Sequence, residues 1–202
     1  MEYIFPELSR EQLPSRIEKT AIMELPLIRY TGSVSLVTTQ EELLASIEHL
    51  SEEAILGFDT ETKPSFRRGQ SNPVSLLQFA AHDHVYLYQL HKLDDLEPLN
   101  DLLSNASIAK AGVALHDDVR LLNQLHTFDP KGFVEISSIT REWGIENTGL
   151  RSLSALLLGH RISKSMQVSN WAKSTLTRAQ IIYAATDAWV ARCLYQRIQE
   201  LH

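Results

Sequence analysis

The sequence contains little cysteine, no long apolar run and no signal-peptide pattern. Cys193 is the sole cysteine, so no intramolecular disulfide can form, and its place in a helical pattern favours a buried, inert thiol over a nucleophile. No segment approaches the roughly 20 apolar residues that cross a bilayer. Residues 1–16 contain acidic residues and prolines where a secretory signal would be basic and then apolar. We therefore expect a cytoplasmic protein without a membrane partner.

The glycines and histidines lack the groupings that support several common chemistries. Gly57, Gly69, Gly112 and Gly159 are isolated, so a phosphate-cradling glycine loop is absent and no nucleotide cofactor is expected. The eight histidines form neither an HExxH pattern nor a spacing with paired cysteines, which disfavours zinc. No internal repeat or low-complexity tract is present, which excludes a solenoid.

Acidic residues outnumber basic residues by 25 to 19, and the formal net charge is −6. This balance argues against a protein that coats nucleic acid through a broad basic surface, because such binding needs many Lys and Arg contacts with phosphate. It does not argue against a metal-dependent nuclease. Two divalent ions on four carboxylates would bring the total to about −2 and place positive charge where a phosphate must bind.

The chain has 202 residues, of which 44% are hydrophobic, and this size and composition suit one globular domain. Residues 1–33 contain three prolines and no sustained period, so we expect a lead-in segment that packs on the domain or frays. Residues 34–202 show regular patterning and form the expected domain. The oligomeric state is not indicated by the sequence.

Hydrophobic periodicity predicts an α/β fold. Capping boxes at Thr39 and Thr177 open two helices. Strands are expected over residues 34–38, 54–58, 74–81, 85–90, 108–115 and 133–136, and further helices over residues 95–104 and 117–126. This order predicts a mixed sheet of five to six strands, with an antiparallel meander followed by parallel strands, flanked by helices.

Asp59 and Glu61 follow the apolar residues 55–58 of the first central strand. Side chains two apart on a strand share a face, so both carboxylates are expected to point the same way. Adjacent carboxylates repel each other unless a cation lies between them. The alternative is a solvated strand exit with ordinary surface acids.

Asp118 lies where a strand runs into a helix. With Leu121, Leu122 and Leu125 it falls at i, i+3, i+4 and i+7, which places it on the apolar stripe, whereas Asp117 lies off that stripe. An inward carboxylate needs a partner. The alternative is that one of the two acids only caps the helix, which does not explain the inward one.

Asp187 lies on the inward stripe of the terminal helix, one turn after Tyr183. The stripe continues through residues 190, 194, 198 and 201. Burying an unpaired carboxylate costs several kcal/mol, so Asp187 is expected to be a metal ligand or part of a buried ion pair. Three inward acids and a tyrosine form an oxygen-rich set that suits Mg²⁺ or Mn²⁺.

These motifs resemble the DEDD exonuclease superfamily, in the tyrosine-bearing branch that includes ribonuclease D and the exonuclease domain of the Werner-syndrome helicase. Residues 58–61 (FDTE) resemble the first family motif, residues 112–122 with Asp118 the second, and residues 183–188 with the YxxxD pattern the third. Residues 149–153 and 169–171 resemble linking segments. The resemblance covers residues from about 34 to 202. In one departure, Glu135 stands where relatives often carry aspartate.

The resemblance implies an RNase H-like fold and a 3′-5′ exonuclease with two divalent cations, Mg²⁺ or Mn²⁺. Asp59 would bridge both ions, Glu61 and Asp187 would hold the ion beside the attacking water, and Asp118 would support the second ion directly or through water. Tyr183, with an ordinary phenol pKa of about 10, is assigned to orienting the water. The expected partner is a nucleic-acid 3′ end, single-stranded or a frayed duplex, and the expected product is a nucleoside 5′-monophosphate.

Several basic and aromatic side chains are candidates for nucleic-acid binding. We expect Arg67, Arg68 and Lys173 to line the strand entrance and Phe66 or Trp171 to stack on bases. Lys63, Lys164 and Arg178 are further basic residues near the motifs. The alternative for each is a solvated loop.

Three alternatives to a DNA-trimming enzyme stay open. DNA is slightly favoured over RNA as the expected substrate, but an RNA-processing exoribonuclease of the ribonuclease D type would use the same chemistry. A catalytically silent nucleic-acid-binding module normally lacks one or more of the metal acids, and all four are present here. An RNase H-like nuclease that cuts internally would not need the YxxxD motif.

Overall fold

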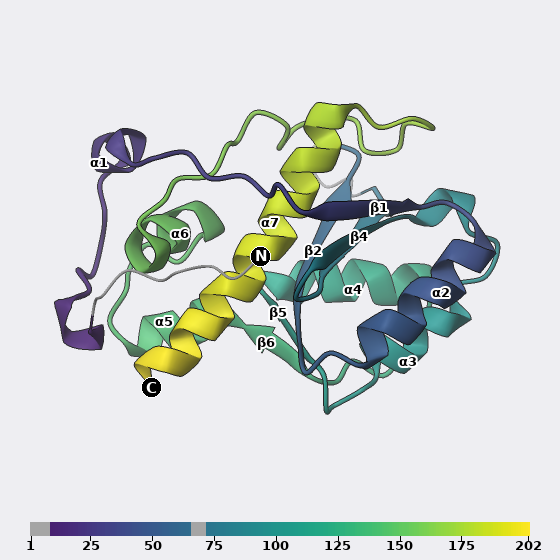
Figure 1. The fold of residues 1–202 in the computed structure, drawn as a ribbon, viewed down its shortest axis with the longest axis horizontal. Helices are drawn as coiled ribbons and strands as arrows, with labels where there is room; N and C mark the ends of the chain where they lie inside the picture. The colour runs from purple at the N-terminus through teal and green to yellow at the C-terminus, as the bar shows by residue number, and fades with distance from the viewer. Residues whose placement is uncertain (1–8, 66–71) are drawn as a thin grey trace.

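The computed structural model describes residues 9–65 and 72–202, and its centre is a six-stranded sheet in the order β1-β4-β3-β2-β5-β6 (Figure 1). β2, β3 and β4 form an antiparallel meander, β5 and β6 add parallel strands beside β2, and β1 pairs in parallel with β4. The predicted mixed sheet is therefore confirmed. The strands are β1 (Ser33–Val37), β2 (Ile55–Thr62), β3 (Val74–Ala80), β4 (His84–Gln89), β5 (Ala109–Gly112) and β6 (Phe133–Glu135).

The helices are α1 (Lys19–Glu24), α2 (Gln40–Ser51), α3 (Asn100–Leu103), α4 (Leu115–Leu125), α5 (Ile136–Glu142), α6 (Leu150–Leu158) and α7 (Arg178–Leu201), with short 3-10 helices η1 (Arg10–Gln12), η2 (Leu90–Lys92) and η3 (Glu97–Leu99). Both predicted capping boxes form: the Thr39 and Thr177 side chains accept from the backbone N–H groups of Glu42 and Gln180. Among the described residues, no helix is both long and apolar enough to cross a membrane.

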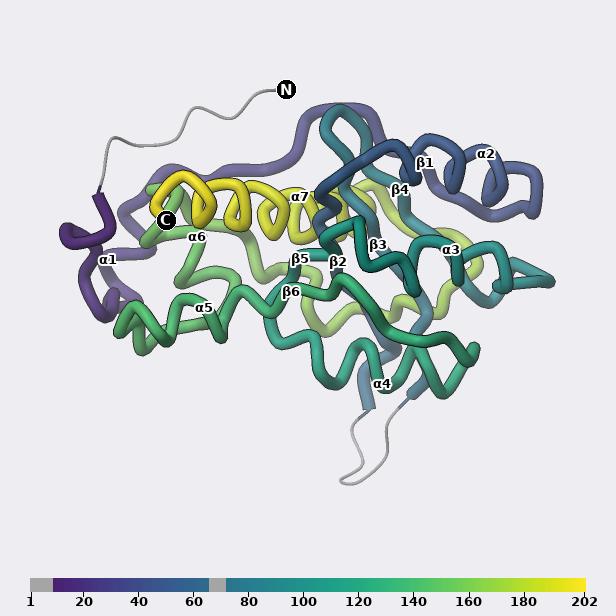
Figure 2. Tube along the Cα trace, turned by 90° about the horizontal axis from the view of Figure 1, so that it is seen from below, coloured from purple at the N-terminus to yellow at the C-terminus, as the bar shows by residue number. Residues whose placement is uncertain are grey.

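The sheet separates two apolar cores, one on each face. On β3, alternate residues point to opposite faces: Leu76 and Ala80 pack with α6 and α7, whereas Leu77 and Phe79 pack with α2, α3 and α4. Figure 1 shows α7 crossing the sheet, and Figure 2 shows the layers from below. Cys193 of α7 is 2% exposed, and burial raises the pKa of its thiol to about 12, so the predicted buried thiol is confirmed.

Three predicted boundaries are wrong for identifiable reasons. The helix expected over residues 95–104 begins only at Glu97 and is divided into η3 and α3, with Pro98 in the first turn, where its missing backbone donor is tolerated. The strand expected to reach Leu115 ends at Gly112, because Ala114 adopts a left-handed conformation with φ 64°. β2 extends to Thr62 rather than ending at Phe58, since it continues to pair with β3.

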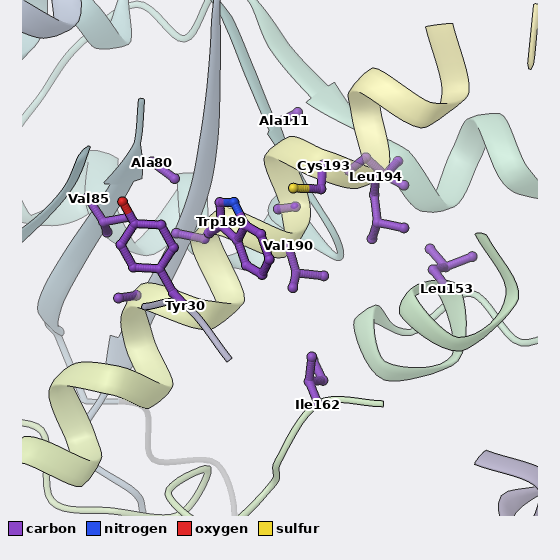
Figure 3. Close-up of a cluster of buried hydrophobic side chains, with 14 of the residues drawn as sticks. Tyr30, Ala80, Val85, Ala111, Leu153, Ile162, Trp189, Val190, Cys193 and Leu194 are labelled. Carbon is purple, nitrogen blue, oxygen red and sulfur yellow. The ribbon is translucent and has the colours of Figure 1, made fainter. Parts of the chain in front are cut away.

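The described part of the N-terminal segment packs on the domain. The backbone N–H of Ile28 donates to the Arg161 carbonyl at 2.9 Å, next to a bridge between Leu27 and Arg161. The Tyr30 ring is buried, and its centroid lies 5.7 Å from that of Trp189 on α7 (Figure 3). Residues 27–30 therefore pack on the domain.

Candidate active site

Asp59 and Glu61 project from the middle of the sheet toward helix α7. Both lie on β2 on the same face as Gly57, and a Cβ at Gly57 would collide with the backbone carbonyl of Ala188. The absence of a side chain at Gly57 thus allows α7 to lie directly against β2. This close approach brings the residue before Ala188, which is Asp187, to the two strand acids.

The carboxylates of Asp59, Glu61 and Asp187 form one cluster. One oxygen from each lies within 4.8 Å of the others, the only such metal-compatible group found among the described residues. Asp187 is 6% exposed, and the two strand acids are half-buried. Three acids separated by up to 128 residues in sequence therefore meet at the face between β2 and α7.

The cluster is electrostatically strained in the absence of a cation. Burial, followed by the charges of Asp187 and Asp118, raises the pKa of Asp59 well above its ordinary value. Burial and the charge of Asp59 likewise raise the pKa of Glu61, and burial raises the pKa of Asp187. A hard divalent cation would relieve this repulsion, and carboxylate oxygens are the ligands such ions prefer, so the residues fit a metal centre.

Asp118 lies beside this cluster but outside it. Its Oδ1 accepts a hydrogen bond of 2.6 Å from the Thr60 hydroxyl, and Thr60 points to the opposite face of β2 from Asp59. Asp118 therefore approaches the strand from the α4 side. Burial raises its pKa to about 6, against the lowering effect of the Thr60 hydrogen bond.

The predicted inward stripe of α4 is only partly correct. Leu122 is buried and Asp118 is half-buried, but Leu125 is 42% exposed. The helix begins at Leu115, which is buried, so the inward face runs from Leu115 through Asp118 to Leu122 and leaves the last turn outside.

Glu135 supports the site, although the sequence indicated it only as a departure from the family motif. Its carboxylate accepts from the backbone N–H groups of Ala114, Leu115 and Ser137 at 3.0, 2.7 and 3.0 Å. Burial opposes its ionisation, but these bonds prevail and lower its pKa. Glu135 thereby fixes the left-handed turn at Ala114 and the start of α4. An acid at the end of one parallel strand, beside a helix that follows the neighbouring strand, is the signal that could have indicated this role.

Tyr183 stands one turn before Asp187, and its hydroxyl donates a hydrogen bond to that carboxylate. Burial, followed by the charges of Asp187 and Glu61, raises the pKa of Tyr183. The phenol therefore stays protonated at neutral pH and acts through hydrogen bonds.

The expectation that Trp171 stacks on bases is wrong. Its side chain is fully buried, with a ring centroid 5.9 Å from that of Tyr183. It has no exposed face for a base, because the apolar core around α7 encloses it. Trp171 instead supports the Tyr183 ring from behind.

The acid cluster borders two cavities. A cavity of about 450 Å³ is lined by Asp59, Glu61, Tyr183 and Asp187, and a cavity of about 810 Å³ is lined by Tyr183 and Asp187 on their other side. These volumes are within the range of small-ligand sites. Tyr183 and Asp187 thus border both cavities, whereas Asp59 and Glu61 border only the smaller one.

The remaining predicted nucleic-acid residues are scattered. Phe66, Arg67 and Arg68 lie outside the described residues. Lys173 is exposed, and its backbone carbonyl accepts from the Gln89 side chain at 3.0 Å. It does not line either cavity beside the acids.

The fold and the site together define an RNase H-like nuclease domain, with acids on a central strand and on the helix that crosses it. The model of the 3′-5′ exonuclease family matches residues 34–201. The chain therefore belongs to the 3′-5′ exonuclease family.

Individual relatives agree with this assignment. The chain is 30% identical over 198 residues to the bifunctional 3′-5′ exonuclease/ATP-dependent helicase WRN of Mus musculus, covering 92% of this chain and 14% of that protein. It is 31% identical over 170 residues to ribonuclease D of Gluconacetobacter diazotrophicus, covering 82% of this chain and 42% of that protein. The crystal structure of the Aedes aegypti Nibbler EXO domain superposes with a TM-score of 0.75 at 25% identity, covering 83% of this chain and 88% of that chain. The chain thus spans less than half the length of the two curated relatives.

Proposed function

We propose that this domain removes nucleoside 5′-monophosphates from nucleic-acid 3′ ends by metal-dependent hydrolysis. The observation that carries the proposal is the partly buried cluster of Asp59, Glu61 and Asp187, in which one carboxylate oxygen of each lies within 4.8 Å of the others beside an open cavity. Membership of the 3′-5′ exonuclease family supports the direction of digestion.

Two divalent cations, Mg²⁺ or Mn²⁺, are the proposed cofactors. Asp59, Glu61 and Asp187 would hold them, and Asp118, fixed by the Thr60 hydroxyl at 2.6 Å, would support the second ion directly or through water. When bound, such ions lower the pKa of an attacking water and neutralise charge that builds up on the phosphate. In the overall reaction, water adds to the phosphorus and the bond to the 3′ oxygen of the preceding nucleotide breaks.

Tyr183 is proposed to orient the attacking water rather than to remove its proton. Its raised pKa keeps the hydroxyl protonated, and its hydrogen bond to Asp187 fixes the ring one turn away from the cluster. The buried Trp171 ring limits rotation of the phenol from the opposite side.

DNA is proposed as the slightly preferred substrate, with RNA as the second candidate. The relatives include a protein named as an exonuclease/helicase and one named as a ribonuclease, so family membership alone does not separate DNA from RNA as the substrate. Paired DNA and RNA strands of equal length and sequence would decide, because only the 2′-hydroxyl differs. A DNA rate no higher than the RNA rate would contradict the preference.

The proposed hydrolysis is tested with a 5′-labelled single strand and Mg²⁺ or Mn²⁺. We expect stepwise shortening from the 3′ end with release of mononucleotides, and loss of both hydrolysis and metal binding in Asp59→Ala. Asp117→Ala is the matched control, because Asp117 is exposed and paired with Arg120 at 3.0 Å. Full activity in Asp59→Ala would refute the assignment, and release of internal oligonucleotides would indicate an endonuclease instead.

A further inference from the structure

The N-terminal segment, residues 9–32, precedes the region matched by the family model and lines both cavities beside the acids. Lys19 and Ile22 of α1 line the smaller cavity, and residues 27–32 line the larger one. Ser163, Tyr183 and Asp187 are common to both cavities. The segment therefore borders the site on both sides of Tyr183 and Asp187.

Specific contacts hold this segment in place. The backbone N–H of Ile17 donates to the Asn147 side chain at 2.9 Å, and that of Tyr30 donates to the Thr186 hydroxyl at 3.0 Å. Between these points, Ile22 is only 3% exposed. Residues 17–30 are thus docked at both ends and in the middle, as a fixed wall requires.

The walls of the two cavities carry positive charge around the acids. Lys19, Arg151 and Lys164 line the smaller cavity, and Arg29 and Arg178 line the larger one. Within residues 9–65 and 72–202, none of these five side chains has an ion-pair partner. Their charges are therefore available to a ligand, and an anionic ligand is the one they match.

Helix α1 also positions one of these cations. The Arg151 guanidinium donates to the Met23 sulfur at 2.9 Å, and its Nε is buried with no hydrogen-bond partner among the described residues. Arg151 is thus held against the N-terminal segment, and its Nε–H group has no acceptor among the described residues.

We propose, building on the proposed function, that residues 9–32 form the outer wall of the substrate cleft. Lys19 and Arg29, on either side of Tyr183 and Asp187, bind successive phosphates of the single-stranded 3′ end. The recognised chemistry is the phosphodiester backbone, so this contact adds affinity without selecting a base sequence.

The test measures binding of a short fluorescein-labelled single strand whose 3′-terminal linkages are phosphorothioates, which resist hydrolysis. Fluorescence anisotropy at several salt concentrations gives the Kd and its salt dependence. In Lys19→Gln and Arg29→Gln the Kd should rise about threefold to tenfold at low salt, and the slope of log affinity against log salt should fall by about 0.7 for each lost phosphate contact. Lys19→Glu should weaken binding further.

Lys131→Gln is the charge-matched control, because Lys131 is exposed and paired with Asp129. It lies just before the edge strand β6 and lines neither cavity beside the acids. It should bind the strand as the wild type does. An unchanged Kd and salt slope in Lys19→Glu and Arg29→Gln would overturn the proposal that residues 9–32 bind the phosphates of the strand. Hydrolysis of the p-nitrophenyl ester of thymidine 5′-monophosphate by the wild type tests the proposed function separately, since this ester has no strand.

A second, independent observation concerns Gln78, which lies directly opposite Asp59 in the β2–β3 pair. Opposed residues in an antiparallel pair point to the same face, with Cβ atoms about 4.5–5.5 Å apart. Gln78 is 0% exposed, and neither its amide nitrogen nor its amide oxygen has a hydrogen-bond partner among the described residues. An unpartnered amide is thus buried beside the acid that is central to the cluster.

Packing alone would favour an apolar side chain over glutamine at position 78. Leu76 and Ala80, the neighbours of Gln78 on the same face of β3, are apolar and belong to the core under α7. An unsatisfied buried polar group costs about 1–3 kcal/mol, so an apolar side chain would be more stable at this position. Residues that break such local rules are expected at functional sites.

We infer, again building on the proposed function, that Gln78 is a positioning residue for Asp59. Its amide N–H group, which has no partner among the described residues, would donate to the Asp59 carboxylate through one water. This bond would set the orientation of the oxygens that would hold a cation. Supporting hydrogen bonds of this kind orient metal-binding carboxylates in proteins.

Gln78→Leu should change stability and metal binding in opposite directions. The Tm of the chelator-treated protein should rise by a few degrees, because leucine suits the surrounding apolar core better than an amide whose oxygen has no partner. The affinity for Mn²⁺ measured by calorimetry should fall about tenfold or more. Gln78→Met, which keeps the side-chain length, should show the same pair of effects. Thr140→Val, a buried change on α5 away from the acids, should leave Mn²⁺ affinity unaltered.

The Mn²⁺ affinity of the variants decides whether Gln78 positions Asp59. If Gln78→Leu and Gln78→Met bind Mn²⁺ as tightly as the wild type does, the positioning role is overturned whatever their Tm. A wild type that binds no Mn²⁺ would instead overturn the metal centre itself, and the role of Gln78 with it.

Discussion

At the scale of single residues, the site is dominated by carboxylates whose charged forms are less favourable than those of ordinary acids. Asp59, Glu61, Asp118 and Asp187 all have raised pKa values, with burial as the first cause in each. Strongly shifted groups in a cleft are typical of functional sites. Here the raised pKa values indicate that a bound cation would stabilise the charged carboxylates.

These shifts predict how the metal-free protein responds to pH. A carboxyl group with a raised folded pKa stabilises the fold when protonated, and this stability is lost as the pH rises from the unfolded value toward the folded one. For Asp118 that window runs from its ordinary value of 3.8 to about 6. We therefore expect Asp118→Asn to remove up to about 3 kcal/mol of the decline in unfolding free energy over this window.

Urea unfolding in a chelating buffer at several pH values between 4 and 7.5 measures this effect. The comparison with Asp118→Asn isolates the one group from Glu42 and Glu135, whose lowered pKa values act in the opposite direction. Parallel pH profiles for the wild type and the variant would contradict the expectation.

Tyr183 allows a second prediction at the residue scale. Tyr183→Phe should keep metal binding but slow hydrolysis about tenfold to a hundredfold, because the hydroxyl that supports Asp187 and the water is lost. In the wild type, the hydrogen bond from Tyr183 lowers the pKa of Asp187. Without this bond the pKa of Asp187 should rise, so the acid limb of the pH–rate profile should move to higher pH in the variant. Steady-state kinetics across pH measures both effects, and an unchanged rate would remove Tyr183 from the mechanism.

At the scale of secondary-structure elements, the contact between β2 and α7 builds the site. Gly57 allows the Ala188 carbonyl to approach the strand, and Asp187 is the preceding residue on the same helix. The position of one carboxylate thus depends on the missing side chain two residues before Asp59.

Gly57→Ala should therefore lower both stability and activity. The new methyl group would force α7 away from β2, at a cost of about 1–3 kcal/mol, and would displace Asp187 from the strand acids. Gly149→Ala is the control for stability only, since a Cβ there has open space around it and the backbone has an ordinary φ of −75°, but Gly149 lines the smaller cavity. Urea unfolding and strand hydrolysis measure the two effects, and wild-type values for Gly57→Ala would refute the close-packing explanation.

At the scale of the whole molecule, the site exists only in the folded chain. Asp59, Asp118 and Asp187 come from β2, α4 and α7, which approach one another only when both faces of the sheet are covered. A cation that binds this set therefore binds the native state far better than the unfolded chain.

We expect Mn²⁺ or Mg²⁺ to raise the Tm in a concentration-dependent manner and a chelator to reverse the rise. At a free metal concentration of about 100 times the Kd, the stabilisation should be about 2.7 kcal/mol. Asp187→Asn, which alters a ligand on the long helix, should greatly reduce the shift. Thermal unfolding followed by fluorescence measures it, and an equal shift in the variant would exclude Asp187 as a ligand.

Much of the fold followed from local patterns in the sequence. The capping boxes at Thr39 and Thr177 set two helix starts, and apolar alternation located the strands to within a few residues. The i, i+4 spacing of Tyr183 and Asp187 and the i, i+2 spacing of Asp59 and Glu61 predicted shared faces, since helix and strand periods are fixed by backbone geometry. These features depend on neighbours in the chain.

The tertiary structure alone decided how the pieces meet. The sequence could not show that Thr60, on the far side of β2, would hold Asp118, that Trp171 would be enclosed behind Tyr183, or that Lys19 would lie beside the acids. Each of these placements depends on contacts between residues far apart in the chain, and local periodicity carries no information about such contacts. The amino-acid sequence therefore determined which groups are present and the faces they share, whereas packing across the sheet determined their distances.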